Sequence, residues 1–164
     1  MALLTSRYRS ATGAATLVAF ILVLVFGSPW YVSWVNSNTR SDTAGGLFLR
    51  TLAWPAWSFD SKAQVRDVLA ADLKALLLIL FTALFVALLV GAELSAARGT
   101  VAALVTGWGA YIFAAAFAGL IAAAVSVHAS LLGALSWAIG GAAYGLLTGW
   151  IIGLASMAGR RPRR

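Results

Sequence analysis

The chain has 164 residues, of which 62% are hydrophobic and only 10% are charged, whereas a soluble domain carries about 25% charged residues. This small number of charges cannot cover the surface of a water-soluble globule. Most of the chain must therefore lie in lipid. The absence of cysteine excludes disulfides and thiolate metal sites. The formal net charge is +7, but much of it lies in a C-terminal tail and forms no nucleic-acid-binding face. The arginines of this tail are Arg160, Arg161, Arg163 and Arg164.

Four hydrophobic runs predict four transmembrane helices, at about residues 14–34, 75–95, 101–125 and 131–158. Each run reaches the ~18 residues that mark a spanning helix, because about 20 residues at 1.5 Å rise cross the hydrocarbon core. The predicted fold class is an all-α integral membrane protein with four transmembrane helices and a juxtamembrane outer segment. Residues 1–164 are expected to form a single four-helix membrane domain.

The first run has two interpretations. Arg7 and Arg9 precede an apolar stretch, as in a signal peptide that is cleaved. Trp30, Tyr31 and Trp34 follow the stretch at the point where an uncleaved helix needs aromatic side chains at the membrane interface. These interfacial aromatics favour a retained transmembrane helix.

The outer loop, residues 35–74, contains an apolar stretch followed by Trp54-Pro55-Ala56-Trp57. The stretch predicts a short helix on the outer surface, and Pro55 predicts a turn after it. Trp54 and Trp57 are expected to lie in the headgroup layer as interfacial anchors. The alternative is an aromatic cage formed by Trp54, Trp57 and Phe59.

The second transmembrane helix is expected to begin before the membrane. The sequence contains a capping box, Ser61-Lys62-Ala63-Gln64. In this motif the side chain of Ser61 accepts a hydrogen bond from the backbone N–H of Gln64, and the side chain of Gln64 accepts one from the backbone N–H of Ser61. The helix should therefore begin near Ser61. Asp72 and Lys74 then lie at the outer edge of the span.

The distribution of arginine predicts the orientation. With the N-terminus inside, the cytoplasmic segments hold Arg7, Arg9, Arg98 and the tail arginines, whereas the basic residues of the outer loop are dispersed among aspartates. Compact basic clusters mark the inside, so both termini should be cytoplasmic and the tail should set topology or bind anionic lipid. Ten arginines against two lysines in a chain rich in Ala and Gly suggest a GC-rich genome. We therefore expect a bacterial cytoplasmic membrane.

The fourth run contains an uninterrupted ladder of glycines four residues apart, Gly141, Gly145, Gly149 and Gly153. Helices in lipid associate by close backbone approach, which a stripe of glycines permits. The ladder therefore predicts a helix-packing surface. It could face another helix of the same chain, a second copy or a different protein.

Candidate chemistry is sparse. The sequence has no paired carboxylates, H-E-x-x-H, G-x-S-x-G or P-loop motif, so we expect no enzyme activity, metal or cofactor. Tyr31 and Glu93 lie at the ends of predicted spans, and the titratable residues further inside are Tyr111 and Tyr144. His128 is interpreted as a loop residue. Leu104–Trp108 and Leu146–Trp150 form similar pentapeptides. The threonines of the two pentapeptides could form a paired site. We favour the alternative, in which each threonine hydroxyl donates to the carbonyl four residues earlier in its own helix.

These patterns predict a non-catalytic small polytopic membrane protein. It would act as an accessory or scaffold subunit that assembles through the glycine ladder. Expected partners are the lipid bilayer and either further copies or another membrane protein, with no nucleic acid. The alternative is a small oligomeric channel or transporter in which the ladder, Ser136 and Thr148 line a pathway. Only Ser136, Thr148 and Ser156 offer hydroxyls on the fourth helix, which is a thin polar lining.

Overall fold

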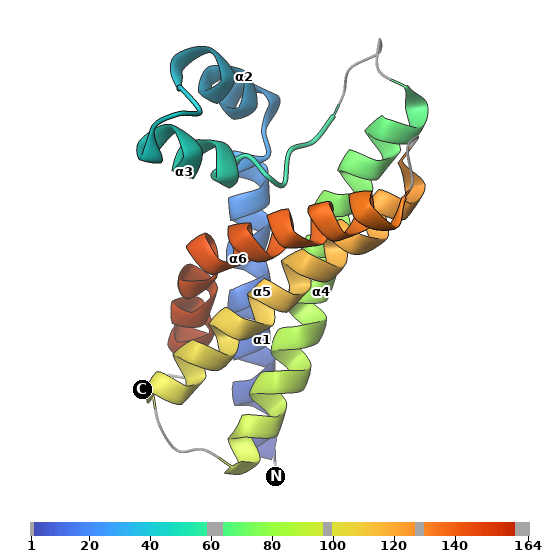
Figure 1. The fold of residues 1–164 in the computed structure, drawn as a ribbon. Coiled ribbons are helices and arrows are strands. Elements are labelled where there is room, and N and C mark those ends of the chain that lie inside the picture. The colour runs from blue at the N-terminus through green and yellow to red at the C-terminus, as the bar shows by residue number, and fades with distance from the viewer. Residues whose placement is uncertain (1, 59–63, 97–99, 127–129, 160–164) are drawn as a thin grey trace.

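The computed structural model describes residues 2–58, 64–96, 100–126 and 130–159, except for the side chains of residues 2–10, 90–96 and 100. Regular secondary structure in these ranges is entirely helical, as the predicted all-α class requires (Figure 1). The helices are α1 (Ala2–Phe26), α2 (Pro29–Asn38), α3 (Ala44–Leu52), α4 (Val65–Ala96), α5 (Thr100–Val125) and α6 (Leu131–Gly159).

The four long helices form a bundle. Helix α1 packs on α4, α4 on α5, α5 on α6, and α6 again on α1. In Figure 1, α1 begins and α6 ends at the lower end, and the connections from α1 to α4 and from α5 to α6 lie at the upper end. The bundle core is formed mainly by alanines, with a few larger side chains among which Leu78, Tyr111, Tyr144 and Ile152 are fully buried.

Three helical segments are long and apolar enough to cross a membrane: Val65–Leu89, Val101–Val125 and Leu131–Gly159. A fourth span results if the bent pair Ala11–Phe26 and Pro29–Asn38 counts as one. The described part of the chain is thus an all-helical protein with three or four candidate spans. Its apolar helices indicate a membrane location.

The first predicted span is not a straight helix over residues 14–34. Helix α1 ends at Phe26, and α2 continues at an angle of 53°. At Gly27, an added Cβ would lie 2.5 Å from Val23 O and would also clash with Pro55 O, so a larger residue does not fit. The Ser28 hydroxyl then accepts from Tyr31 N as the N-cap of α2, and Pro29 occupies the first turn. The bend therefore has local causes.

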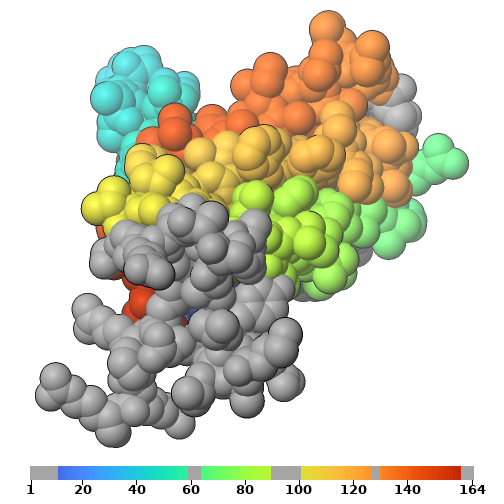
Figure 2. Space-filling model, turned by 90° about the horizontal axis from the view of Figure 1, so that it is seen from below, coloured from blue at the N-terminus to red at the C-terminus, as the bar shows by residue number. Residues whose placement is uncertain are grey.

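The predicted outer loop, residues 35–74, contains the end of α2, all of α3 and the first turns of α4. Helix α3 is the short helix that the sequence predicts, and Tyr31, Val35 and Leu52 join α2 to α3 in a small apolar cluster. We call α2 and α3 together the upper module. Figure 2, seen from below, shows residues of this module in cyan protruding beside the bundle.

Helix α4 begins at Val65, where Gln64 O accepts hydrogen bonds from Asp67 N and Val68 N. Gln64 lies outside the helix, so the predicted start near Ser61 is wrong and α4 begins four residues later. Other predictions on residues outside the described ranges concern Ser61, Lys62 and Ala63 of the capping box, Phe59, His128 and the tail arginines.

Candidate functional site

Helix α6 buries two adjacent stripes of residues. The first is the glycine ladder, and the second recurs at the same spacing three residues later. All eight residues are buried: Gly141, Gly145, Gly149 and Gly153 in the first stripe, and Tyr144, Thr148, Ile152 and Ser156 in the second. Positions i, i+3 and i+4 share a helix face, so the two stripes form one continuous buried surface.

The glycine ladder faces α5 of the same chain. A Cβ at Gly145 would lie 2.7 Å from Ile112 Cα, and one at Gly153 would lie 2.5 Å from Leu104 O. Gly141 approaches the Ala115 carbonyl, and Gly149 approaches the indole ring of Trp108. Of the three partners that the sequence leaves open, the neighbouring helix of the same chain occupies the ladder.

Several polar groups in the core bond to backbone or to each other, whereas Thr12 Oγ1 is buried with no partner among the described residues. Thr148 Oγ1 donates to Tyr144 O at 2.8 Å, which is the i−4 bond that the sequence favours for this threonine. The hydroxyls of Tyr111 and Tyr144 lie 3.3 Å apart in a hydrogen bond. Ser136 is exposed, so it does not share a surface with the buried Thr148.

Trp57 anchors the segment between α3 and α4 to the end of α1. Its indole Nε1 donates to Val23 O at 3.2 Å, and its backbone N donates to Gly27 O at 3.0 Å. Carbonyls in the last turn of a helix lack partners within the helix. Val23 O also accepts from Gly27 N, so Trp57 adds a second bond there and supplies a partner for Gly27 O at the C-terminus of α1.

Trp54 packs against α6. Its ring stacks on Tyr144 with the centroids 5.5 Å apart. The absence of a side chain at Gly140 and Gly141 makes room for this ring, because a Cβ there would meet Trp54 atoms at 3.1 Å and 2.8 Å. Glycines of α6 thus accommodate an aromatic residue as well as a helix.

Lys74 lies between two tryptophans at the upper end of the bundle. Its Nζ is 5.0 Å from the ring centroid of Trp54 and 5.3 Å from that of Trp137, which are cation–π distances. The aromatic cage that the sequence offers as an alternative thus has a counterpart here. It is built from Trp54 and Trp137 and holds the chain's own ammonium group.

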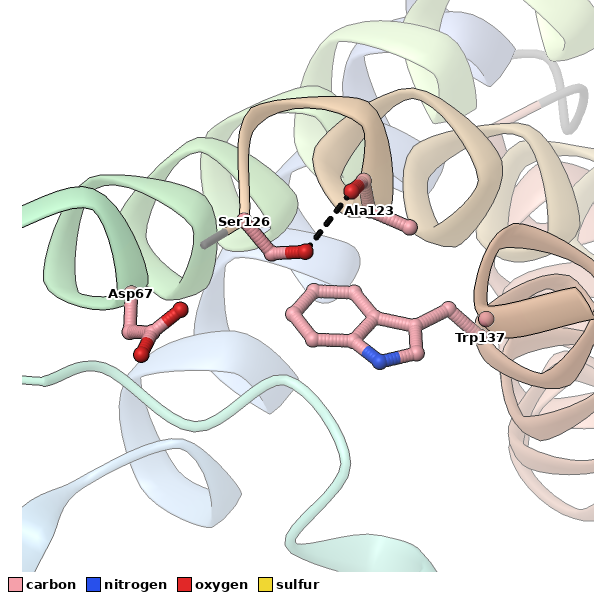
Figure 3. Close-up of a pocket in the computed structure, with 5 residues that line it drawn as sticks. Asp67, Ala123, Ser126 and Trp137 are labelled. Atoms are coloured by element: carbon pink, nitrogen blue, oxygen red, sulfur yellow. Dashed lines mark hydrogen bonds between the residues drawn. The ribbon is translucent and has the colours of Figure 1, made fainter. Parts of the chain in front are cut away.

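Next to this cluster is a pocket of about 300 Å³ between the start of α4, the end of α5 and the start of α6. In Figure 3 the Asp67 carboxylate and the Trp137 indole extend toward each other across the opening. Ser126 lies beside them, with its hydroxyl bonded to Ala123 O at 2.8 Å. Gly133 completes the lining. The pocket therefore joins a carboxylate and a hydroxyl to an aromatic wall.

The predicted interfacial aromatics of the first run have different environments. Trp30 and Trp34 are exposed, at 76% and 42%. Tyr31 is buried inside the upper module, where its hydroxyl donates to Leu49 O at 3.2 Å. The exposed indoles, with Leu47 and Phe48 of α3, give the upper module an apolar outer surface.

Sequence reasoning missed the cluster around Lys74, because its members lie on three segments far apart in the chain. Trp137 follows the glycine ladder's spacing, four residues before Gly141, and this is the one signal that places it near the packed face.

No protein-family model, curated protein or solved structure shows significant similarity to this chain. Within the described ranges, no group of three His, Cys, Asp or Glu side chains is arranged to hold a metal ion. The function must therefore be argued from the packing and the upper-end cluster.

Proposed function

We propose that this protein is a non-catalytic accessory or scaffold subunit of a membrane assembly. The observation that carries the proposal is the state of the buried hydroxyls in the membrane-spanning helices. Those of Thr82, Thr148 and Ser156 donate to backbone carbonyls of their own helices, whereas the buried Thr12 Oγ1 of α1 has no partner among the described residues. Hydroxyls that are already bonded in this way offer little to a substrate or a permeating ion, so the bundle interior is suited to packing.

We assign the glycine ladder to the inside of the subunit. Its contacts with α5 support a rigid α5–α6 pair, and a partner bound through the same surface would have to displace α5. The partner surface proposed instead is the upper module. Exposed Trp30, Trp34, Leu47 and Phe48 give it an apolar face of the kind that marks protein or membrane contacts.

The proposed location is a bacterial cytoplasmic membrane with both termini cytoplasmic. Helix α1 begins and helix α6 ends at the same end of the bundle (Figure 1), which supports a location of both termini on one side of the membrane. The clustered arginines near the chain ends favour the cytoplasm for that side. The upper module would then face outward.

Purification in mild detergent followed by native mass spectrometry tests the scaffold proposal. We expect the protein to be recovered with a second membrane protein. The double variant Leu47→Gln, Phe48→Gln should lose that partner, whereas Leu131→Gln, which changes a similarly exposed residue of α6, should keep it.

Two results would contradict the proposal. One is recovery as a monomer in every mild detergent. The other is recovery as a ring of identical copies that conducts ions in planar bilayers, which would establish the channel alternative.

A further inference from the structure

Lys74 lies inside the candidate span Val65–Leu89, but it is the last charged residue before a charge-free stretch of α4, which we take as the part that crosses the hydrocarbon core. It directly precedes residues 75–92, a stretch of α4 without a charged residue that would span about 27 Å at 1.5 Å per residue. That length is close to the thickness of the hydrocarbon core. Lys74 is therefore at the depth of phospholipid headgroups, on the side of the upper module.

Three hydrogen-bond donors at this place lack a protein acceptor among the described residues. They are Lys74 Nζ and the indole N–H groups of Trp54 and Trp137, whose rings flank the ammonium. Three other indoles donate to backbone: Trp57 to Val23 O, Trp108 to Leu146 O and Trp150 to Leu147 O. The exposed indoles of Trp30 and Trp34 have no protein acceptor among the described residues. Around Lys74, three such donors, one of them charged, lie close together.

An ammonium and two N–H donors form the complement of an oxyanion, and phosphate is the oxyanion present at headgroup depth. Lys74, Trp54 and Trp137 are each partly accessible, so a ligand can reach them. The pocket shares Trp137 with this donor group and carries Asp67 on the same helix as Lys74, two turns earlier. A carboxylate at that place favours a ligand that also has a positive charge.

We propose that the upper end of the bundle binds the headgroup of an amine-bearing phospholipid such as phosphatidylethanolamine. The phosphate lies at Lys74 between Trp54 and Trp137, and the ammonium enters the pocket toward Asp67. The acyl chains extend into the bilayer along the apolar surface of α4. This lipid site is separate from the scaffold role and does not depend on a protein partner.

Native mass spectrometry of the detergent-purified full chain, titrated with defined phospholipids, tests this site. We expect phosphatidylethanolamine to bind more tightly than phosphatidylglycerol or diacylglycerol. Lys74→Gln should weaken its binding by about tenfold or more, because a charge-assisted hydrogen bond is lost. Arg66→Gln removes the same charge from an exposed position near the start of α4 and should change binding little.

Two further variants separate binding from folding. Trp137→Phe keeps an aromatic ring beside Lys74 but removes the indole donor, and it should weaken binding several-fold. Asp67→Asn should reduce the preference for phosphatidylethanolamine over phosphatidylglycerol. Circular dichroism of each variant shows whether the helices are retained.

Several results would overturn the lipid assignment. Equal binding of phosphatidylethanolamine to the wild type and to folded Lys74→Gln would exclude a role for the ammonium. Equal affinity for phosphatidylglycerol would exclude recognition of the amine. Binding of soluble glycerophosphoethanolamine as tightly as the lipid would show that the ligand is a free headgroup compound.

Discussion

Single glycines determine how closely the helices approach. At Gly145 the Ile112 backbone occupies the space that a side chain would need, whereas nothing lies within 4 Å of a Cβ placed at Gly109. Gly145 therefore has no room for an added side chain, whereas Gly109 does. The helix propensity of glycine is the same at both, so the difference comes from the neighbouring helix alone.

Gly145→Ala should lower the free energy of unfolding by about 1–3 kcal/mol, because the new methyl group forces α5 and α6 apart. Gly109→Ala should leave stability unchanged or raise it by up to about 1 kcal/mol, since alanine favours the helix. Unfolding in mixed detergent followed by circular dichroism measures both. Equal stability of the two variants would show that the ladder has no packing role.

A single indole N–H at Trp57 connects the segment after α3 to α1. Trp57→Phe preserves the ring but removes the bond to Val23 O, so stability should fall by about 0.5–1.5 kcal/mol. Trp30→Phe is the matched control, because Trp30 is 76% exposed. The same unfolding measurement applies, and a larger loss at Trp30 than at Trp57 would contradict this placement.

At the scale of the element, the two short helices are defined by their first residues. The hydroxyls of Ser28 and Thr43 accept from Tyr31 N and Gly46 N, and each opens a helix at the position that a side-chain cap prefers. Helices of this length are marginal on their own. Their stability therefore depends on the caps and on the small cluster that joins them.

Ser28→Ala should destabilise α2 by about 0.5–2 kcal/mol through loss of the N-cap. Amide hydrogen exchange should quicken in α2 while α5 and α6 stay protected, because the bundle does not depend on this cap. Ser33→Ala makes the same change at an exposed site within α2 and should have little effect. Faster exchange throughout the bundle would mean that the upper module is part of one cooperative unit with it.

At the scale of the whole molecule, the position of the chain ends follows from the number of spans. Reporters fused after Ser10 and after residue 164 should be cytoplasmic, and one inserted after Ser41, between α2 and α3, should be external. An external C-terminus combined with a cytoplasmic N-terminus would require an odd number of spans. A mature N-terminus at Ser28 would instead identify the first run as a signal peptide.

The sequence alone determined the class of the protein and the approximate extent of its long helices. Hydropathy and length are local properties, so the runs at 101–125 and 131–158 correspond closely to α5 and α6. Glycine spacing also identified the face of α6 that packs. The short helix α3 could be predicted because its apolar residues are followed by Pro55.

The tertiary structure alone decided which surfaces meet. Lipid and protein interiors are both apolar, so hydropathy cannot distinguish a helix face that contacts lipid from one that contacts α5. For the same reason the sequence predicted Trp54 and Trp57 as interfacial residues but did not show that they pack on α6 and α1. The setting of Lys74 depends on Trp54 and Trp137, which come together only when the segment after α3 folds back onto α6. Contacts between segments far apart in the chain leave no periodic signal in the sequence.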